Sequence, residues 1–415
     1  MERAISVSGW TGSARADAAD RAGEASVAGL VAGAVGFFFA FRVAIVLVAV
    51  RGFLADAQTG AAISLALNYL LVFAAALVAA GPARIPLAAM ARVAPLRWAG
   101  AFLALSGVSL LWSQTASLPA AAAFWIAMAC DVAVILLLVR GSGARAVGFA
   151  LMKGYIWGAC AFAALAWLLP AQSDLRLGDE ELLGPNQIGY VCAVAVFFAQ
   201  YLVRNRARGW TVPAAFLAIT LLRTLSKTSI AAFVAGEAFI LLRDRGMKRS
   251  VKIGLAVLAV VVTLAFQGLI ASYYEIYSNA GNQAETLSGR LGIWAYFFTA
   301  SLESPWIGHG FHSVWKVVPP FGPFEARHAH NEWLQQFYAY GATGVVVVAG
   351  FYVIVFRHIR RCATGADKTL LLGLLVFSVV RGLADTEVFD VSLCLWLATL
   401  LSLMLAESAA GKSQS

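Results

Sequence analysis

Long apolar runs recur along the chain from Val27 to Ala406, separated by short polar or basic connections. A helix needs about 20 mainly apolar residues to cross a bilayer, and on that measure the sequence predicts about twelve transmembrane helices. The predicted spans are 28–51, 59–80, 97–113, 119–139, 147–169, 186–203, 210–224, 227–243, 251–271, 339–357, 369–385 and 388–406. The fold class expected is therefore an all-α polytopic membrane protein.

Basic residues gather in every second connection between these runs, a pattern that marks cytoplasmic loops. They are Arg84, Arg92 and Arg97; Arg140 and Arg145; Arg204, Arg206 and Arg208; Arg243, Arg245, Lys248, Arg249 and Lys252; and Arg357, Arg360, Arg361 and Lys368. The alternation predicts that both termini are cytoplasmic. Residues 1–26 are then a disordered tail without a cleaved signal peptide, 27–271 hold spans one to nine, 339–407 hold the last three, and 408–415 are a second tail.

Composition agrees with a membrane protein, because 61% of residues are hydrophobic and only 13% are charged. The net charge of +9 would suggest a nucleic-acid partner in a soluble protein. Here the basic residues are topology signals, so no nucleic-acid partner is expected. The five cysteines have no CxxC spacing and are interpreted as small core residues: Cys130, Cys160, Cys192, Cys362 and Cys394.

The connection at 272–338 is much longer than the others and falls on the non-cytoplasmic side. Long loops are usually functional or disordered. This one is rich in aromatic residues and glycine, so the sequence predicts a folded, partly helical cap.

Three cations lie on that same side, where the positive-inside rule makes them unusual: Arg223, Lys227 and Arg290. Ser226 and Ser288 could cap helices that start beside Lys227 and Arg290. A cation together with a helix N-terminus suits an anion, phosphate above all. Alternatively, Arg223 and Lys227 snorkel to the interface and Arg290 pairs with a glutamate of its own helix, Glu285 or Glu303.

Further polar residues accompany these cations. Asn186, in LGPNQIGY at the mouth of the sixth span, could donate a hydrogen bond to a sugar hydroxyl or a phosphate. Three charges inside spans are costly and are functional candidates, although mutual pairing that fixes helix packing is equally consistent with the sequence: Arg42, Asp131 and Glu237. Four more cluster at the outer ends of the last two spans and could complete a polar site or form a solvated rim: Arg381, Asp385, Glu387 and Asp390. All of these residues are left without an assigned role.

Four of the five histidines fall between His309 and His330, in HGFH and HAH. Asn331 is a good cap residue, so a helix is expected to begin near it, with Glu332 in its first turn. A start one turn earlier would instead place His330 on an apolar helix face. Three roles are open for these imidazoles: metal ligands, packing among aromatic residues, or a general base. Metal is the weakest, because the spacing fits no zinc motif and Glu325 is the only carboxylate close by in sequence.

The segments SGRLGIW, ESPWIGHGF and HAHNEWLQQFYAYGATG resemble the O-antigen ligase and polymerase superfamily of bacterial envelope glycosyltransferases, as do LGPNQIGY and LSKTS upstream. The resemblance runs from about Leu183 to the tenth span. It implies an inner-membrane enzyme with a periplasmic active site, a glycan on undecaprenyl diphosphate as donor, and an inverting reaction without metal or cofactor. The partners it implies are the lipid-linked O-antigen, a lipid A-core acceptor and membrane lipid.

Residue by residue, the resemblance implies that His330 is the catalytic base and that Arg290 holds the diphosphate, with Asn331 beside the base. Lys227 occupies a position that the family usually fills with arginine, so Arg223 could share its role. Ala339 stands where many members have a glutamate.

Within the superfamily, a ligase is favoured over a polymerase because only one outer connection is long, and over a protein O-oligosaccharyltransferase because little sequence follows the last span. Outside it, the alternative is a transporter of an anionic lipid-linked substrate.

Overall fold

The structure is a computed structural model that describes residues 26–81, 83–172, 174–179, 181–205, 207, 209–243, 248–250, 252–254, scattered positions from 257 to 275, and then 287–321, 326–361, 366–387 and 390–412. Its helices are α2 (Val27–Leu47), α3 (Ala57–Ala79), α4 (Leu87–Met90), α5 (Ala94–Val108), α6 (Leu118–Ser142), α7 (Ala144–Leu168), α8 (Pro185–Arg204), α9 (Thr211–Arg223), α10 (Lys227–Arg243), α13 (Leu287–Ser301), α14 (Glu332–Arg361), α15 (Ala366–Gly382) and α16 (Leu395–Lys412). A π-helical turn, Val48–Gly52, continues α2, and a 3-10 turn, Ser109–Leu111, continues α5. The described part of the chain contains no strand, so the all-α class is confirmed for it.

Seven helices of the described residues are long and apolar enough to cross a membrane. They are Val27–Gly52, Ala57–Ala79, Ala94–Leu111, Leu118–Ser142, Ala144–Leu168, Pro185–Arg204 and Glu332–Arg361. Four further predicted spans correspond to the shorter helices α9, α10, α15 and α16. The ninth predicted span, 251–271, lies largely outside the described residues, as do residues 1–25. The count of twelve therefore stays a prediction.

Three helix boundaries differ from the predicted ones. The last span was expected to begin at residue 388, but α16 begins at Leu395. Asp390 accepts hydrogen bonds from the Val391 N–H (2.7 Å) and the Leu395 N–H (3.1 Å), so residues 390–394 form a turn that precedes the helix. Ser288 was expected to cap a helix, whereas α13 already begins at Leu287. The predicted tail 408–415 is helical up to residue 412.

Connections that were predicted to be periplasmic meet at one end of the bundle, here called the outer end. The Gln114 N–H donates to the His309 carbonyl (2.9 Å), and the Arg327 guanidinium donates to the Glu181 carbonyl (3.1 Å). Basic connections meet elsewhere, where the Arg84 N–H donates to the Arg140 carbonyl (2.8 Å). The structure thus separates the two sets of loops as the charge alternation requires. Which membrane side each set faces remains a prediction.

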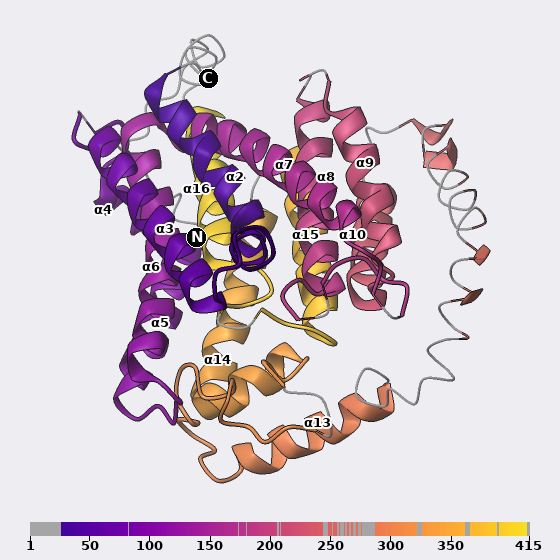
Figure 1. Cartoon of the computed structure of the whole chain (residues 1–415). Helices are drawn as coiled ribbons and strands as arrows, with labels where there is room; N and C mark the ends of the chain where they lie inside the picture. Colours follow the sequence, from indigo (N-terminus) through magenta and orange to yellow (C-terminus); the bar gives the residue numbers. More distant parts are fainter. Residues whose placement is uncertain are drawn as a thin grey trace.

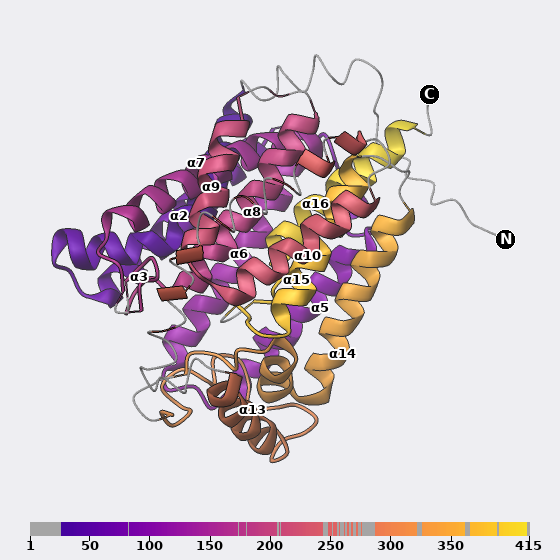
Figure 2. The ribbon, with the colours of Figure 1, turned by 90° about the vertical axis from the view of Figure 1, so that its right-hand side faces the viewer.

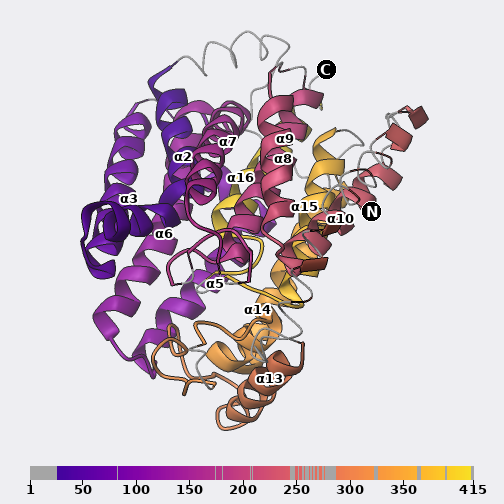
Figure 3. The same cartoon turned by 45° about the vertical axis from the view of Figure 1, so that its right-hand side comes forward.

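Small residues let α2 and α7 approach closely along their length. A side chain on Gly36 would overlap the Leu151 carbonyl, and one on Gly154 would overlap the backbone of Gly33. Such small-residue contacts drive helix association in lipid, where the hydrophobic effect between helices is absent. Figure 3 shows α2 beside α7 on one side of the molecule and α10 beside α15 on the other.

The outer segment predicted as a cap is folded where it is described. Helix α13 lies across the outer end of the bundle (Figures 1 and 2). A separate hydrophobic cluster joins α13 to the following loop and to the start of α14; its buried members are Ile293, Phe297, Val314, Val318, Ala329 and Tyr338. Gly341 has φ of 64° and breaks α14 into a short outer part and a long inner part. A side chain there would overlap the Trp306 backbone, so the kink needs glycine.

Candidate active site at the outer end of the bundle

The start of α14 follows the cap expected from sequence. Asn331 Oδ1 accepts a hydrogen bond from the Leu334 N–H (3.1 Å), and its Nδ2 donates to the Leu383 carbonyl (2.9 Å). The earlier helix start is thereby excluded. His330 directly precedes the cap with φ of 50°, a conformation that costs energy in a residue with a side chain. This strained backbone turns the histidine toward the segment between α15 and α16, residues 383–394, called here the α15–α16 linker.

Asp385 in this linker faces both histidines of the HAH motif. Its Oδ1 lies 3.5 Å from His330 Nδ1 and 3.8 Å from His328 Nε2, and the two imidazole centroids are 4.1 Å apart. The His330 N–H donates to His328 Nδ1 (3.2 Å), so His328 carries its proton on Nε2, toward Asp385. Burial, then the neighbouring His330, lowers the pKa of His328 to about 3, which keeps this imidazole neutral. His328 therefore supports the position of His330 and is not the candidate general base.

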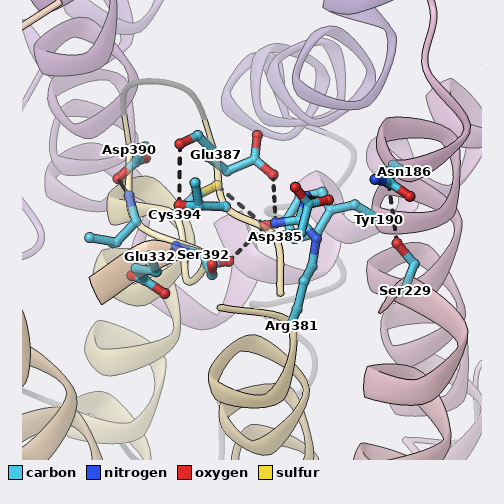
Figure 4. Close-up of polar contacts among 12 residues, drawn as sticks. Asn186, Tyr190, Ser229, Glu332, Arg381, Asp385, Glu387, Asp390, Ser392 and Cys394 are labelled. Atoms are coloured by element: carbon cyan, nitrogen blue, oxygen red, sulfur yellow. Dashed lines mark hydrogen bonds and ion pairs between the residues drawn. The ribbon is translucent and has the colours of Figure 1, made fainter. Parts of the chain in front are cut away.

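Arg381 holds Asp385 from the end of α15 (Figure 4). Its Nη2 lies 3.4 Å from Asp385 Oδ2, its Nη1 lies 3.0 Å from Glu387 Oε1, and its guanidinium stacks 4.4 Å from the Tyr190 ring centroid. Burial alone would raise the pKa of Asp385, but Arg381 and the two histidines outweigh it and hold this pKa well below its usual value. A carboxylate thus stays ionised beside the His330 imidazole.

Glu332 joins the three elements around this cluster. It is 1% exposed, accepts hydrogen bonds from the Tyr352 hydroxyl (3.1 Å) and the Ser392 N–H (3.2 Å), and lies against Gly382. The Tyr352 hydroxyl in turn accepts from the Leu393 N–H (3.2 Å). Glu332 therefore ties the start of α14 to the end of α15 and to the linker.

Two of the predicted phosphate-binding positions meet beside the linker. Arg290 Nη1 lies 2.5 Å from the Ala384 carbonyl and 3.5 Å from Thr228 Oγ1, in the first turn of α10. Lys227 is exposed at that helix start, which Ser226 caps by accepting from the Ser229 N–H (3.3 Å), as predicted. Arg290 thus links the residue before Asp385 to the first turn of α10, which also carries Lys227.

Asn186 joins this group from the first turn of α8. Its Oδ1 accepts a hydrogen bond from the Ser226 hydroxyl (2.6 Å), and its carbonyl accepts one from the Ser229 hydroxyl (3.2 Å; Figure 4). The amide Nδ2 is then the group that Asn186 can offer to a ligand.

Arg223 makes different contacts, although it lies one turn before Lys227 in sequence. Its guanidinium donates to the Leu175 carbonyl (2.5 Å) and stacks on Trp167, whose ring centroid is 6.0 Å away. Arg223 therefore fixes the connection between α7 and α8 in this structure.

The other pair of histidines lies apart from HAH, within the cap. His309 contacts Gln114 Oε1 (3.1 Å) and the Ala300 carbonyl (3.0 Å), so it packs the cap onto the bundle. His312 stacks on Phe124, with ring centroids 5.4 Å apart. These two histidines follow the packing interpretation.

A metal site is geometrically conceivable, because one ligand atom each of His328, His330 and Asp385 lie within 4.8 Å of one another. Asp385 supplies the carboxylate that sequence proximity did not reveal. However, Arg381 already occupies Asp385 Oδ2, and its positive charge opposes a second cation in the cluster. The donor set thus fits an oriented imidazole better than a bound metal.

The charged groups inside the bundle have partners of their own. Arg42 pairs with Asp131, which also accepts from Asn68 Nδ2 (3.0 Å), and Glu237 accepts from Gln200 Nε2 (2.7 Å). The mutual-pairing interpretation therefore holds for Arg42 and Asp131, whereas Glu237 bonds a neutral amide.

Residues 212–349 match a family model described as O-antigen ligase. This match supports membership of the O-antigen ligase superfamily. The matched region runs from α9 to the inner part of α14, so it contains Lys227, Arg290 and His330. Members of the superfamily are membrane glycosyltransferase-like enzymes.

Two other comparisons add little to this assignment. A solved structure described as "Structural coordination of polymerization and crosslinking by a peptidoglycan synthase complex" is similar over 76% of this chain and 96% of that chain, with 16% identity and a TM-score of 0.41. That level of likeness does not by itself establish a shared fold. The comparison with curated proteins gives no match.

Proposed function

We propose that this protein is an O-antigen ligase of the bacterial inner membrane, which transfers a glycan from undecaprenyl diphosphate to a sugar hydroxyl of lipid A-core on the periplasmic face. The observation that carries the proposal is the convergence of His330, Arg290 and Asn331 on residues 383–385 of the linker. The convergence brings a base and cations to one place, as glycosyl transfer from a diphosphate requires.

His330 would act as the general base. Its Nδ1 faces Asp385, so its Nε2 is the nitrogen that can take a proton from the acceptor hydroxyl. Asp385 orients the imidazole and stabilises the imidazolium that forms. Arg381 keeps this carboxylate ionised.

Arg290 and Lys227 would hold the diphosphate, together with the N-terminus of α10. The acceptor oxygen forms a bond to the anomeric carbon while the bond from that carbon to the diphosphate oxygen breaks. The electron pair leaves on the diphosphate, where these cations stabilise it, and the acceptor proton moves to His330. Attack from the face opposite the leaving group inverts the anomeric configuration, and no metal or cofactor takes part.

Asn186 and Asn331 have separate roles in this scheme. Asn186 would donate from Nδ2 to the donor. Both ends of the Asn331 amide bind the protein, so this residue would keep the base at the linker. Arg223 would act indirectly, by holding the connection between α7 and α8.

Complementation in two bacterial hosts tests the proposed branch, one host lacking the ligase and the other lacking the polymerase. A ligase should restore capped lipopolysaccharide in the first host alone, and His330→Ala should fail to cap while lipid-linked glycan accumulates. Restoration in the polymerase-deficient host would make the protein a polymerase. If His330→Ala caps lipopolysaccharide at the wild-type level, His330 is not the general base, and a transporter is favoured.

A further inference from the structure

Helix α13 carries apolar side chains on two sides. One side, which includes Phe297, is buried in the hydrophobic cluster of the cap. On the other side, Leu291 and Phe298 lie two turns apart and are exposed, and Leu302 continues their line in the turn after the helix. Arg290 is the one charged residue of α13. A helix that is apolar all round is normally covered, by protein or by lipid.

The turn that follows α13 enlarges this exposed apolar surface. Five of its side chains are between 50% and 72% exposed, and together they are called here the α13 face: Leu291, Phe298, Leu302, Trp306 and Ile307. Glu303 is the one charge between Leu291 and Ile307. Exposed apolar patches of this kind mark contacts with another protein or with a membrane.

The start of the long part of α14 fixes the level of this turn. The Ala342 N–H donates a hydrogen bond to the Pro305 carbonyl (2.7 Å). Residues 342–361, the part of α14 after its kink, extend for about 30 Å at roughly 1.5 Å per residue, which is about the thickness of the hydrocarbon core of a bilayer. Trp306 therefore lies at the outer boundary of this core, where tryptophan is enriched in membrane proteins.

The outward surface of α14 adjoins the α13 face. Val346 and Val353 are exposed two turns apart on α14, which is long and apolar enough to cross a membrane, so both face acyl chains. Thr343 lies one turn before Val346 on the same side of the helix, and its hydroxyl donates to the Trp306 carbonyl (2.8 Å). A lipid-facing surface thus continues from α14 to Trp306.

We propose that the α13 face lies in the membrane, against the acyl chains of the leaflet at the outer end of the bundle. Helix α13 runs across the bundle, whereas α14 runs along it (Figure 1), which is the orientation of an in-plane interfacial helix. A second copy of the chain would also cover an apolar face, but the bilayer is the surface that α14 brings next to this one. The lipid contact does not depend on glycan transfer.

Quenching by lipid tests the contact in the full-length protein, reconstituted in liposomes of phosphatidylcholine and phosphatidylglycerol without lipid A. A fluorescent amino acid replaces Phe298, and some of the phospholipids carry a nitroxide quencher on the acyl chain close to the glycerol. The label at position 298 should lose most of its emission. A label in place of Val346 is the positive control and should also be quenched, whereas one in place of Lys316, an exposed cation of the cap loop, should keep its emission.

A matched pair of variants ties the quenching to the α13 face. With the label at position 298, Leu302→Asp should reduce the quenching, because a charge is costly at this depth, and Leu302→Met should keep it. Equal quenching in the two variants would overturn the proposal. So would an unquenched label at position 298 of the otherwise unchanged protein. Emission typical of an apolar environment would then indicate a second copy of the chain, and emission typical of water would show that the face is in solvent.

Discussion

Two of the arginine–aspartate pairs among the described residues have different surroundings. Within the bundle, Arg42 of α2 pairs with Asp131 of α6, and the Asn68 amide also donates a hydrogen bond to this carboxylate. At the outer end, Arg381 pairs with Asp385 in a more buried setting, with both side chains 2% exposed against 33% and 7% for Arg42 and Asp131. We call the Arg42–Asp131 pair closed, because its contacts join transmembrane helices to one another.

The outer pair is open. Asp385 Oδ1 faces two imidazoles, and Arg290 contacts the neighbouring Ala384 carbonyl and the first turn of α10. Removing one member of a buried pair leaves an uncompensated charge in either place. The difference teaches that the same chemical pair can fix helix packing in one region and orient a reactive group in another, so mutations should separate stability from activity.

Arg290→Ala should show the largest effect among the residues around the open pair. It removes the guanidinium that would stabilise the leaving diphosphate, and loss of one such group costs about 10² to 10³ in rate. Initial rates of transfer with purified protein measure the effect. Arg290→Lys should recover part of the loss, since it restores charge without the fork. A normal rate for Arg290→Ala would show that the diphosphate binds elsewhere.

Asp385→Asn and Asp131→Asn compare the two pairs directly. Asp385→Asn should lower the rate per folded molecule by about 100-fold, the lower end of the usual scale for general acid–base catalysis. Asp131→Asn should instead lower the stability of the fold by about 3 to 5 kcal/mol, with the rate per folded molecule unchanged. Thermal unfolding in detergent and initial rates are measured on the same preparations. The distinction between an open and a closed pair fails if both variants lose the same property.

Glu332→Gln should have a smaller effect, because Glu332 acts through the backbone that it holds. Gln keeps one oxygen for the Ser392 N–H but puts an N–H in place of Oε2, which accepts from the Tyr352 hydroxyl. The linker should therefore shift and kcat should fall by roughly tenfold, the scale of one lost hydrogen bond to a charged group, with KM kept. Glu237→Gln is the matched control, since Glu237 contacts Gln200 within the bundle. An unchanged kcat for Glu332→Gln would show that the linker holds its position without this carboxylate.

His328 gives the smallest effect, on the pH dependence of stability. Its folded-state pKa of about 3 lies below the ordinary value of about 6.5. Between these pH values, the unfolded chain binds a proton at His328 and the folded chain does not. Stability should therefore decrease as pH falls from about 6.5 toward about 3, by at most about 1.4 kcal/mol per pH unit from this group. Thermal unfolding in detergent across this range should show a shallower decrease for His328→Gln. The same pH dependence in both proteins would contradict a buried neutral imidazole.

The sequence predicted the features that depend on local pattern. The Asn331 and Ser226 caps were confirmed because a cap bonds two or three residues along the chain. Helix positions followed from apolar runs, and the sorting of the loops at two ends followed from charge. Arg290 was picked out because it is a cation on the unexpected side.

Contacts across the fold could not be predicted in this way. Asp385 is 55 residues from His330, and nothing in the local pattern of either residue indicates the other. Glu332 was expected to favour a helix N-terminus, yet it is buried against Ser392 because α15 and α16 close over it. Arg223 contacts Leu175 because its guanidinium turns toward the connection between α7 and α8. The one indication in the sequence was the run of charges from Arg381 to Asp390, which is unusual beside two apolar spans.

Transfer by purified protein in liposomes tests the central claim most directly. The donor is undecaprenyl diphosphate-linked glycan, the acceptor is lipid A-core, and the products are glycosylated lipid A-core and free undecaprenyl diphosphate, measured for the wild type and His330→Ala. The account predicts that the wild type forms both products in equal amounts, and that His330→Ala slows their formation by at least about 10²-fold while it remains folded. Transfer at the wild-type rate by folded His330→Ala would contradict it.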